Sequence, residues 1–516
     1  MQYITASKLY SYIQCPHRVW RDVWGPQDEK IQETNPFVQM LWDKGIQHEE
    51  NIVSQIGEYL DMSAGNYEDR FNKTIQAMSN KTPLIYQGVL QFENMRGIPD
   101  LLRLLPDGTY VPIEIKSGMA FQGSDEENDE SGKPKKHYAV QLAMYIDLLN
   151  KLNFEHNHLS RVIDIRGNEV DYKLNLPLGK KDKTTIWEFY KKTKNNVEVL
   201  INNDDQNKPA LSGICKLCPW YNSCKKWINE SDDLTKIYYV GRAKRDTINM
   251  DLGIEKAIDI LSIDVEDVLS QKKKNKEFMK GVADKTLNSI MNRAKVLLEI
   301  KKPVVYKKIE FPKVSYELFF DIEDDPTQEF VYMHGVYEKS HFGEVFKHFT
   351  ATEITPDAEK DAWKRFWDYV KLLPKDDYAV YYYSHHEKTT YKKMQKLYPD
   401  VVTEQEVEDF FANPNVIDLF KIVSKYTDWP VSSYSLKDLA QCLGFRWRDE
   451  TPSGALSIQW FNEYIKTKEE SILSRILEYN EDDCKATMVL KEGIEKLINT
   501  TICSKKYLKK INQTMN

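Results

Sequence analysis

The chain has 516 residues and a mass of 60.6 kDa, with 41% hydrophobic and 29% charged residues. This composition is typical of a globular protein with several domains and argues against a disordered chain. The formal net charge of −7 excludes a uniformly basic nucleic-acid coat but leaves room for a local basic groove. No apolar run has the roughly 18 residues that a membrane span needs, and the first residues lack a signal-peptide pattern. We therefore expect a cytoplasmic protein that does not enter a membrane.

The first 230 residues show a mixed α/β pattern that predicts one domain. Helical periodicity alternates with short apolar runs that have the composition of strands. An acidic stretch over 124–132 predicts an exposed loop. The expected elements are helices over 6–24, 36–60 and 137–152, and strands over 84–92, 101–105 and 110–115.

Residues 231–308 are predicted to form a helical connector. Gly253 and Gly281 separate helical stretches there, a pattern compatible with helix–hairpin–helix units, whose backbone amides can contact phosphates. Ordinary helix packing, with glycine just after a helix end, explains the same pattern and is preferred. We see no internal repeat of fixed period. From residue 309 to 516 a second α/β pattern follows, with strands expected over 316–322, 330–337 and 378–383 and a long helix over 468–498.

Two carboxylates stand on neighbouring strands of the first domain. Strand alternation places Glu114 and Lys116 on one face, and a hairpin brings Asp100 near them. Carboxylates in this arrangement bind Mg²⁺ or Mn²⁺, and a lysine beside them stabilises negative charge at phosphorus. Taken alone, these three residues are explained better by an exposed hairpin with ordinary charges.

Three further residues favour a metal site over an exposed hairpin. His48 lies on the upstream helix, while Gln141 and Tyr145 share a face of the downstream helix. The whole set resembles the PD-(D/E)XK nucleases of the RecB type over about residues 1–230, which implies a restriction-endonuclease-like fold. The resemblance implies metal binding by His48, Asp100 and Glu114, a catalytic role for Lys116, and auxiliary roles in catalysis for Gln141 and Tyr145.

Four of the seven cysteines form a second signal. Cys215, Cys218 and Cys224 lie within ten residues, and Cys15 lies 200 residues earlier. Four thiolates suit a [4Fe–4S] cluster or a structural Zn²⁺ ion. One remote cysteine with a close group of three resembles the iron-staple RecB-like nucleases, which implies the cluster. Zinc is the main alternative, and four free buried thiols are the other.

A second acidic set lies in the C-terminal half. Asp321 and Glu323 share one face at the end of an apolar strand, where paired carboxylates can hold two divalent ions. Tyr479 and Asp483 share a face of the last helix. This combination resembles the DEDD exonucleases of the RNase H-like, DnaQ-type fold. The resemblance implies that the three acids bind metal and that Tyr479 orients the attacking water.

The middle motif departs from that family. Glu387 stands where the family has an aspartate and is one methylene longer, so the site either tolerates glutamate or is weakened. Asp418 is another candidate for the interior, and a helix cap or a structural acid explains it equally well. For the whole set, the alternative is an RNase H-like domain that binds nucleic acid without cutting it.

The pairing of these two domains resembles an uncharacterised bacterial family of RecB-like nucleases over nearly the whole chain, including residues 434–437 and 479–483. We therefore expect a divalent-metal-dependent nuclease with two active sites, acting exonucleolytically on single-stranded DNA or DNA ends. Because no Gly-x4-Gly-Lys-Ser/Thr loop is present, unwinding would need a separate helicase. The alternatives are a nucleic-acid end- or structure-binding module with one live site, and a ribonuclease acting through the C-terminal domain.

Overall fold

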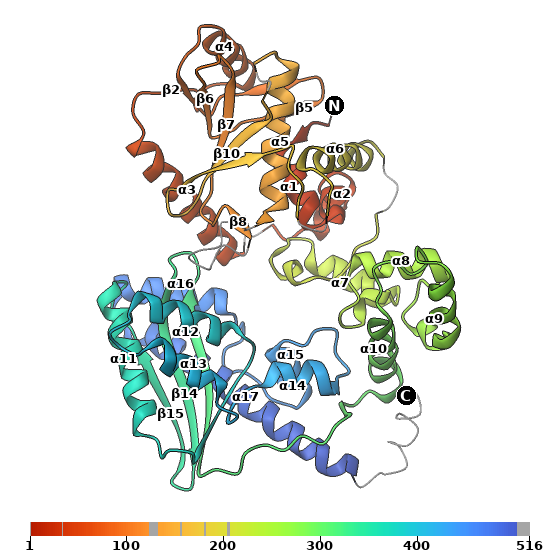
Figure 1. The fold of residues 1–516 in the computed structure, drawn as a ribbon, viewed down its shortest axis with the longest axis vertical. Coiled ribbons are helices and arrows are strands. Elements are labelled where there is room, and N and C mark those ends of the chain that lie inside the picture. Colours follow the sequence, from red (N-terminus) through yellow and green to blue (C-terminus); the bar gives the residue numbers. More distant parts are fainter. Residues whose placement is uncertain are drawn as a thin grey trace. The chain divides into compact units, whose positions relative to one another are not determined.

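The computed structural model describes residues 2–32, 35–122, 133–154, 157–179, 182–203 and 207–502 (Figure 1). Its internal contacts divide the chain into two compact units, Met1–Lys226 and Trp227–Asn516. The acidic loop expected over 124–132 lies outside the described residues. In the part that is described, no helix combines the length and the apolar character needed to cross a membrane.

The first unit is built on a six-stranded mixed sheet in the order β11-β10-β7-β6-β3-β2. The inner strand β7 pairs antiparallel with β6 and parallel with β10, and all of its residues are buried. A small second sheet has the order β1-β5-β4. The strands are β1 (Ile4–Thr5), β2 (Leu60–Asp61), β3 (Leu84–Tyr86), β4 (Leu90–Phe92), β5 (Met95–Gly97), β6 (Leu101–Leu104), β7 (Tyr110–Ile115), β10 (Leu159–Ile163) and β11 (Glu169–Lys173).

Helix α5 (Lys136–Lys151) forms the centre of this unit's main core. Nearly all of its side chains from Ala139 onward are buried among β-strands and helix α1. Such an apolar helix is expected where both of its sides are covered by other elements. The other helices are α1 (Ala6–Gln14), α2 (Pro16–Trp24), α3 (Pro36–Gln55), α4 (Tyr67–Ser79), α6 (Ile186–Asn202) and α7 (Tyr221–Glu230), with a short 3-10 turn η2 (Gly213–Leu217).

Two expected elements of the first unit are each divided in two. The helix expected over 6–24 breaks at Cys15, whose extended backbone (φ −160°) ends α1 while Pro16 opens α2. Proline suits the first position of a helix because it has no N–H to leave unpaired. The strand expected over 84–92 breaks between β3 and β4, where Gln87 adopts a left-handed conformation (φ 50°).

Residues 231–308 form short helices that belong to the second unit. They pack on the rest of that unit through Arg293, whose guanidinium bonds Asp428 at 3.2 Å, and through Tyr238, which stacks on Tyr434 at 3.7 Å between ring centroids. The elements are η3 (Leu234–Lys236), α8 (Arg242–Leu252), η4 (Ile258–Ser262), α9 (Val265–Lys274), α10 (Asp284–Lys295) and a π-helical turn η5 (Val296–Ile300).

Two places in this helical segment share a local pattern of burial and backbone conformation. Buried residues recur 42 positions apart, from Val240 to Val282 and from Ile248 to Ile290. A left-handed residue precedes each buried valine, Tyr239 (φ 74°) and Gly281 (φ 86°). The expectation of no internal repeat stays a prediction. The helix–hairpin–helix interpretation stays a prediction.

The remainder of the second unit is a five-stranded mixed sheet in the order β15-β14-β13-β16-β17. Strands β13, β14 and β15 pair antiparallel, whereas β13, β16 and β17 pair parallel. The strands are β13 (Tyr316–Asp325), β14 (Phe330–Ser340), β15 (Gly343–Thr350), β16 (Tyr378–Tyr382) and β17 (Val416–Asp418), and a separate short pair is formed by β12 (Val304–Val305) and β18 (Thr427–Asp428).

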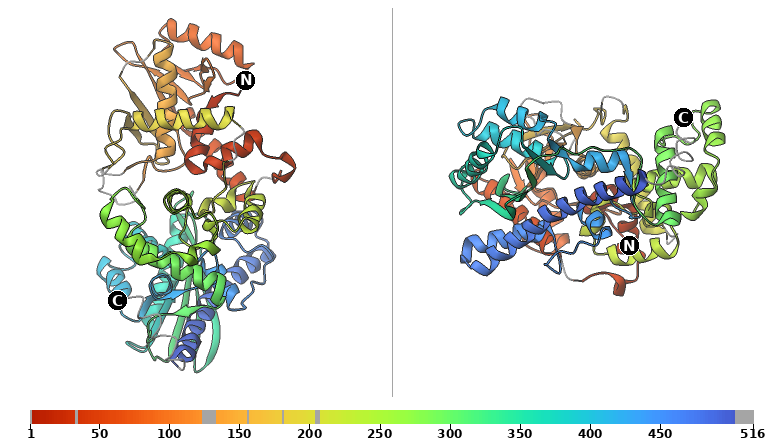
Figure 2. Two further views of the ribbon diagram at one scale, coloured as in Figure 1. Left: turned by 90° about the vertical axis from the view of Figure 1, so that its right-hand side faces the viewer. Right: turned by 90° about the horizontal axis from the view of Figure 1, so that it is seen from below.

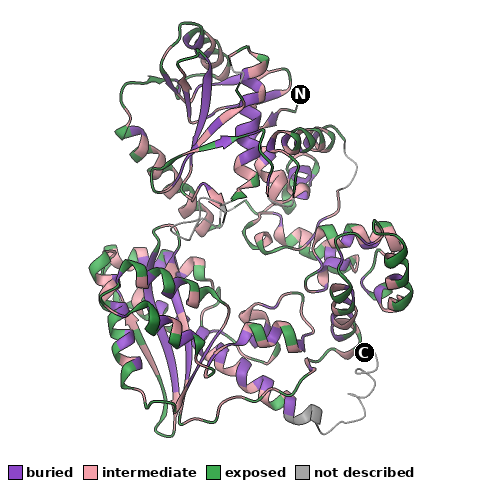
Figure 3. Cartoon of the chain, in the orientation of Figure 1, coloured by how far each residue is buried: buried purple, intermediate pink, exposed green. Residues whose placement is uncertain are grey.

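Helices cover both faces of this sheet (Figures 1 and 2). Leu318 and Phe320 of β13 pack with the helices of one face, and Phe319 packs with α17 on the other, because neighbouring residues of a strand point to opposite sides. The inner strands are accordingly buried for most of their length (Figure 3). The helices are α11 (Pro356–Leu372), α12 (His386–Leu397), α13 (Glu404–Ala412), α14 (Leu419–Tyr426), α15 (Leu436–Cys442), α16 (Gly454–Thr467) and α17 (Glu470–Ile502).

Two candidate active sites

Three carboxyl groups meet where α17 crosses β13. Asp321 and Glu323 follow Phe319 on the face of β13 that α17 covers, and Asp483 comes from α17 itself. One carboxylate oxygen of each residue lies within 4.8 Å of those of the other two. Across the described residues, no other group of three or more acids, histidines and cysteines converges so closely. Hard divalent cations favour such oxygen-only ligand sets.

Asn480 holds two of these acids in place. Its side-chain amide donates to Asp321 Oδ2 at 2.9 Å and to Glu323 Oε1 at 3.3 Å. The close approach of α17 depends on Gly335, which faces Asp321 across the β13–β14 ladder. A Cβ atom on Gly335 would lie 1.6 Å from Asn480 Oδ1, so any larger residue would displace the amide. The sequence patterns did not single out either residue, because their importance depends on strand register.

Further donors hold one oxygen each of Asp483 and Glu323. The indole N–H of Trp447 donates to Asp483 Oδ1 at 2.7 Å. The Tyr332 hydroxyl lies 3.3 Å from Glu323 Oε2 and 2.8 Å from Ser457 Oγ. Neutral donors of this kind orient carboxylates without cancelling their charge, so the site keeps its capacity for cations.

Burial raises the pKa of all three acids, and repulsion within the trio adds to this at Asp321 and Glu323. For Asp321 burial is the main cause, followed by the charges of Asp483 and Glu323. Burial, then Asp483, raises the pKa of Glu323 to about 8, and burial also raises that of Asp483. Like charges this close keep their protons unless a cation compensates them. The cluster is therefore suited to exchanging protons for a divalent ion.

Tyr479 lies directly beside the acids. Its side chain is buried, and it shares a face of α17 with Asp483, which lies one turn further along the helix. Burial, followed by the charge of Asp483, raises its pKa well above the usual value. The hydroxyl therefore stays protonated near neutral pH and is available as a hydrogen-bond donor.

Glu387 and Asp418 take different places. Glu387 is buried in the first turn of α12, where its Oε2 makes no hydrogen bond to the described residues and its pKa rises to about 8 through burial. Its charge raises the pKa of Asp321, although it stays outside the close trio. Asp418 caps α14 by accepting from Phe420 N at 2.9 Å and also accepts from Ser384 N at 3.2 Å. Asp418 thus shapes the turn that leads into Glu387.

The first unit brings its own acids and lysine together. Asp100 immediately precedes β6 and accepts from the backbone N–H of Ile115 at 2.7 Å. Glu114 is 4% exposed and forms an ion pair with Lys116. Burial, followed by the charge of Glu114, raises the pKa of Asp100. Burial lowers the pKa of Lys116, but the charges of Glu114 and Asp100 outweigh burial, so the pKa of Lys116 is raised. Glu114 is buried and Lys116 is half-buried, so this ion pair differs from the exposed hairpin that was the alternative.

Tyr145 and His48, two of the three residues expected to complete this site, have different surroundings. Tyr145 is buried beside Glu114, which contributes to its raised pKa after burial itself. His48 points its Nε2 at the backbone oxygen of Asp164, at 3.1 Å. Its neighbour Glu49, which the sequence patterns did not single out, accepts from Tyr86 at 2.9 Å and raises the pKa of Asp100.

A cleft of about 740 Å³ opens beside helix α5 in the same unit. Gln141 lines it with a side chain that is 9% exposed and whose Oε1 makes no hydrogen bond to the described residues. Trp42 of α3, which is 55% exposed, lines it as well. Arg18, Lys30 and Lys216 also line it, and Asp22 in the same lining pairs with Lys30 at 2.8 Å. The combination of an exposed aromatic ring with cations is typical of surfaces that bind single-stranded nucleic acid.

The four expected cysteines surround one cavity. Cys15, Cys215, Cys218 and Cys224 all line it, together with apolar groups such as Trp220. Burial raises the pKa of Cys218 and raises that of Cys224 to about 12. No three of these sulfur atoms lie within 4.8 Å of one another. Zn–S bonds of about 2.3 Å in a tetrahedron require sulfur atoms about 3.8 Å apart, so the thiols are spread more widely than one zinc ion needs.

The C-terminal fold and its acidic trio define an RNase H-like domain. In agreement, residues 318–494 match the RNase H superfamily. The match includes all three acids of the trio and Tyr479, and it supports a metal-dependent nuclease or hydrolase. Neither the curated proteins nor the solved structures include a match to this chain. The PD-(D/E)XK assignment of the first unit remains a prediction.

Proposed function

We propose that the chain is a divalent-metal-dependent nuclease that hydrolyses DNA from the ends of single strands. The observation that carries this proposal is the meeting of Asp321, Glu323 and Asp483 in an RNase H-like domain. Mg²⁺ or Mn²⁺ bound there would polarise a phosphodiester and activate water. Asn480 and Trp447 keep the carboxylates pointed at one place, and Tyr479 presents a protonated hydroxyl beside Asp483.

We propose a second active site at Asp100 and Glu114, with Lys116 as its catalytic lysine and His48 as a further ligand. The ion pair between half-buried Lys116 and buried Glu114, and the raised pKa of Asp100, support it. Lys116 would stabilise charge on the phosphate, and a cation would release it from Glu114. Because the His48 ring is held at Asp164, its entry into the ligand set would need a change of side-chain orientation.

The cleft beside α5 supports a single-stranded substrate. A strand in it would meet the exposed face of Trp42 and the cations of the lining, and would have Gln141 as a polar contact. Base stacking and backbone charge contacts of this kind depend little on sequence. The proposal is therefore an enzyme without strong sequence preference, which trims one strand at a time.

We propose that the four cysteines hold a [4Fe–4S] cluster rather than a zinc ion. Their wide spacing around one cavity supports the larger group. The cluster would tie Cys15, between α1 and α2, to η2 and α7 near the end of the unit. Closing so long a loop removes much of the conformational freedom of the unfolded chain.

The cluster can be tested with Cys218→Ser. We expect the wild-type protein, purified without oxygen, to be coloured and to contain iron but no stoichiometric zinc. The variant should lose the iron and the visible absorbance. It should also unfold at a lower temperature, because the cross-link between the ends of the unit is broken. Cys442→Ser, which changes an exposed cysteine, is the control. A colourless wild-type protein with one bound zinc would refute the cluster.

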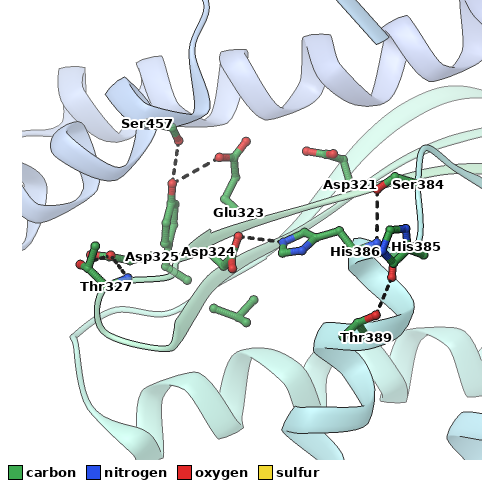
Figure 4. A network of polar contacts seen from close by, with 12 residues as sticks. Asp321, Glu323, Asp324, Asp325, Thr327, Ser384, His385, His386, Thr389 and Ser457 are labelled. Carbon is green, nitrogen blue, oxygen red and sulfur yellow. Dashed lines mark hydrogen bonds and ion pairs between the residues drawn. The ribbon is translucent and has the colours of Figure 1, made fainter. Parts of the chain in front are cut away.

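The proposed activity can be tested with Asp321→Asn, which keeps the size of the side chain and removes its charge. We expect Mn²⁺-dependent cleavage by the C-terminal site to fall by at least about 100-fold, because one of the converging ligands is lost. Asp324→Asn is the matched control, since Asp324 lies on the same strand but pairs with His386 at 3.0 Å (Figure 4). Wild-type protein that folds, binds Mn²⁺ and cuts neither DNA nor RNA would contradict the proposal.

A further inference from the structure

Lys437 connects three segments of the C-terminal domain at its acidic site. It lies in the first turn of α15 and is half-buried. Its ammonium donates to the backbone oxygen of Pro452 at 2.7 Å and to the hydroxyl of Tyr479 at 3.0 Å. It also lies 4.9 Å from the centre of the Tyr479 ring and 5.9 Å from that of Trp447. Trp447 donates a hydrogen bond to Asp483, and Tyr479 lies one helical turn from Asp483 on α17.

The chemistry of the donors fixes the direction of this chain of contacts. An ammonium group can only donate, so the oxygen of Tyr479 must accept from Lys437. The tyrosine proton is then left for a second acceptor, and the carboxylate of Asp483 is available for that role one helical turn further along α17. A tyrosine without the lysine would have no such constraint on the rotation of its hydroxyl. Lys437 therefore sets where the Tyr479 hydroxyl points.

The position of the charge matters as well as the hydrogen bond. Burial raises the pKa of Asp321, Glu323 and Asp483. The positive charge of Lys437 lowers the pKa of each of them. The same positive charge repels any divalent ion that the three acids hold. Because the charge of Lys437 opposes metal binding, a contribution to the reaction explains its place better than a contribution to metal binding does.

We propose that Lys437 is a positioning residue for strand cleavage, which acts by holding the Tyr479 hydroxyl in its orientation toward Asp483. The inference deepens the proposed function and rests on it, because Tyr479 is the group proposed to orient the attacking water. Small displacements of such a group cost much of the rate, since the reacting atoms must be aligned within fractions of an ångström. Lys437 thus influences the reaction through Tyr479 without touching the substrate.

The proposal predicts opposite effects on rate and on metal affinity. Lys437→Met removes the charge and the donor, so kcat should fall by roughly 100-fold. The affinity for Mn²⁺ at about pH 8.5 should stay equal or increase, because a repelling charge is gone. Lys437→Arg keeps the charge and the donor, and it should recover part of the lost rate. A merely structural role would instead lower stability, metal affinity and rate together.

The experiment compares Lys437→Met, Lys437→Arg, Tyr479→Phe and the double variant Lys437→Met/Tyr479→Phe in the full chain. Cleavage rates, Mn²⁺ titration calorimetry and thermal unfolding are measured for each. Lys468→Met is the matched control, because Lys468 also donates to a backbone oxygen, that of Thr352 at 2.9 Å, and lies over Tyr464. We expect the double variant to be no slower than Tyr479→Phe alone, and the control to behave as wild type.

Each outcome decides the proposal. Losses in Lys437→Met and Tyr479→Phe that multiply in the double variant would overturn it, as would weaker Mn²⁺ binding in Lys437→Met. If Lys437→Met does not fold, Lys437→Arg and the Mn²⁺ affinities decide in its place. Wild-type protein without cleavage would remove the proposed function, whereas an active wild type with an equally active Lys437→Met would remove only this inference.

Discussion

At the scale of single residues, the acidic trio shows how burial prepares a metal site. Glu323 is 5% exposed and accepts a hydrogen bond from Asn480, yet its pKa rises to about 8, mainly through burial and the charge of Asp483. In the unfolded chain the same group loses its proton near its usual value. Between those two values the folded protein without metal binds more protons than the unfolded protein does, so its stability falls as the pH rises.

This shift predicts that metal binding depends on pH. A divalent ion must displace the protons held by Glu323 and its neighbours, so Mn²⁺ affinity should increase from about pH 6 to about pH 8 and then level off. The measurement is titration calorimetry in buffers of different ionisation enthalpy, which also counts the protons released. Glu323→Gln should weaken binding and flatten the curve. Affinity that is constant over this range in the wild type would contradict the account.

The same scale shows what the sequence could predict of the site. Asp321, Glu323 and Asp483 were expected from spacing alone, and the structure brings them together. Gly335 and Asn480 were not expected, because no local pattern marks them and their contact depends on the register of β14 and on the crossing of α17. The metal-binding acids can be predicted from local sequence patterns. The residues that hold those acids in place can be found only from the tertiary structure.

At the scale of elements, the approach of α17 to the sheet decides the geometry of the C-terminal site. The helix contacts β13 and β14 and contributes Asp483, Tyr479 and Asn480. The bare backbone of Gly335 leaves the space that Asn480 occupies. A helix that stood further from the sheet would separate Asp483 from Asp321 and Glu323. Close packing here is therefore a requirement of the metal site as well as of the core.

Gly335→Ala tests this dependence. The added methyl group overlaps the Asn480 amide, so we expect the free energy of unfolding to fall by about 1–3 kcal/mol and Mn²⁺ affinity to fall with it. Urea unfolding and calorimetry measure the two effects. Gly57→Ala is the control, since nothing lies within 4 Å of a Cβ atom there. Unchanged metal affinity in Gly335→Ala would show that the approach of α17 is less critical than we argue.

The elements themselves were predicted well where one residue pattern governs them. Strand β7 and helix α5 lie close to their expected positions, and the long last helix appears as α17. The helix expected over 6–24 and the strand expected over 84–92 were too long, because Cys15 and Gln87 adopt backbone conformations that hydrophobic periodicity does not register. Pro16 was a visible signal for the first break.

At the scale of the whole molecule, the chain combines a supported domain with a proposed one. The RNase H-like assignment rests on fold, acidic trio and family match together. The first unit has an ion pair between buried Glu114 and half-buried Lys116 next to Asp100, and a cavity lined by four cysteines, but the comparisons found no match to it. The resemblance of the first unit to iron-staple RecB-like nucleases implies attack from the 5′ end, and that of the second to DEDD exonucleases implies attack from the 3′ end. We therefore propose that the two sites attack strands of opposite polarity.

The measurement that tests this account most directly is Mn²⁺-dependent digestion of single-stranded DNA labelled separately at its 5′ and 3′ ends. Wild type, Lys116→Ala and Asp321→Ala are compared after purification without oxygen. We predict that each substitution abolishes release from one end and leaves release from the other intact. If Lys116→Ala alone abolishes all cutting and Asp321→Ala cuts as wild type does, the C-terminal acidic trio is not an active nuclease site and the central claim is wrong.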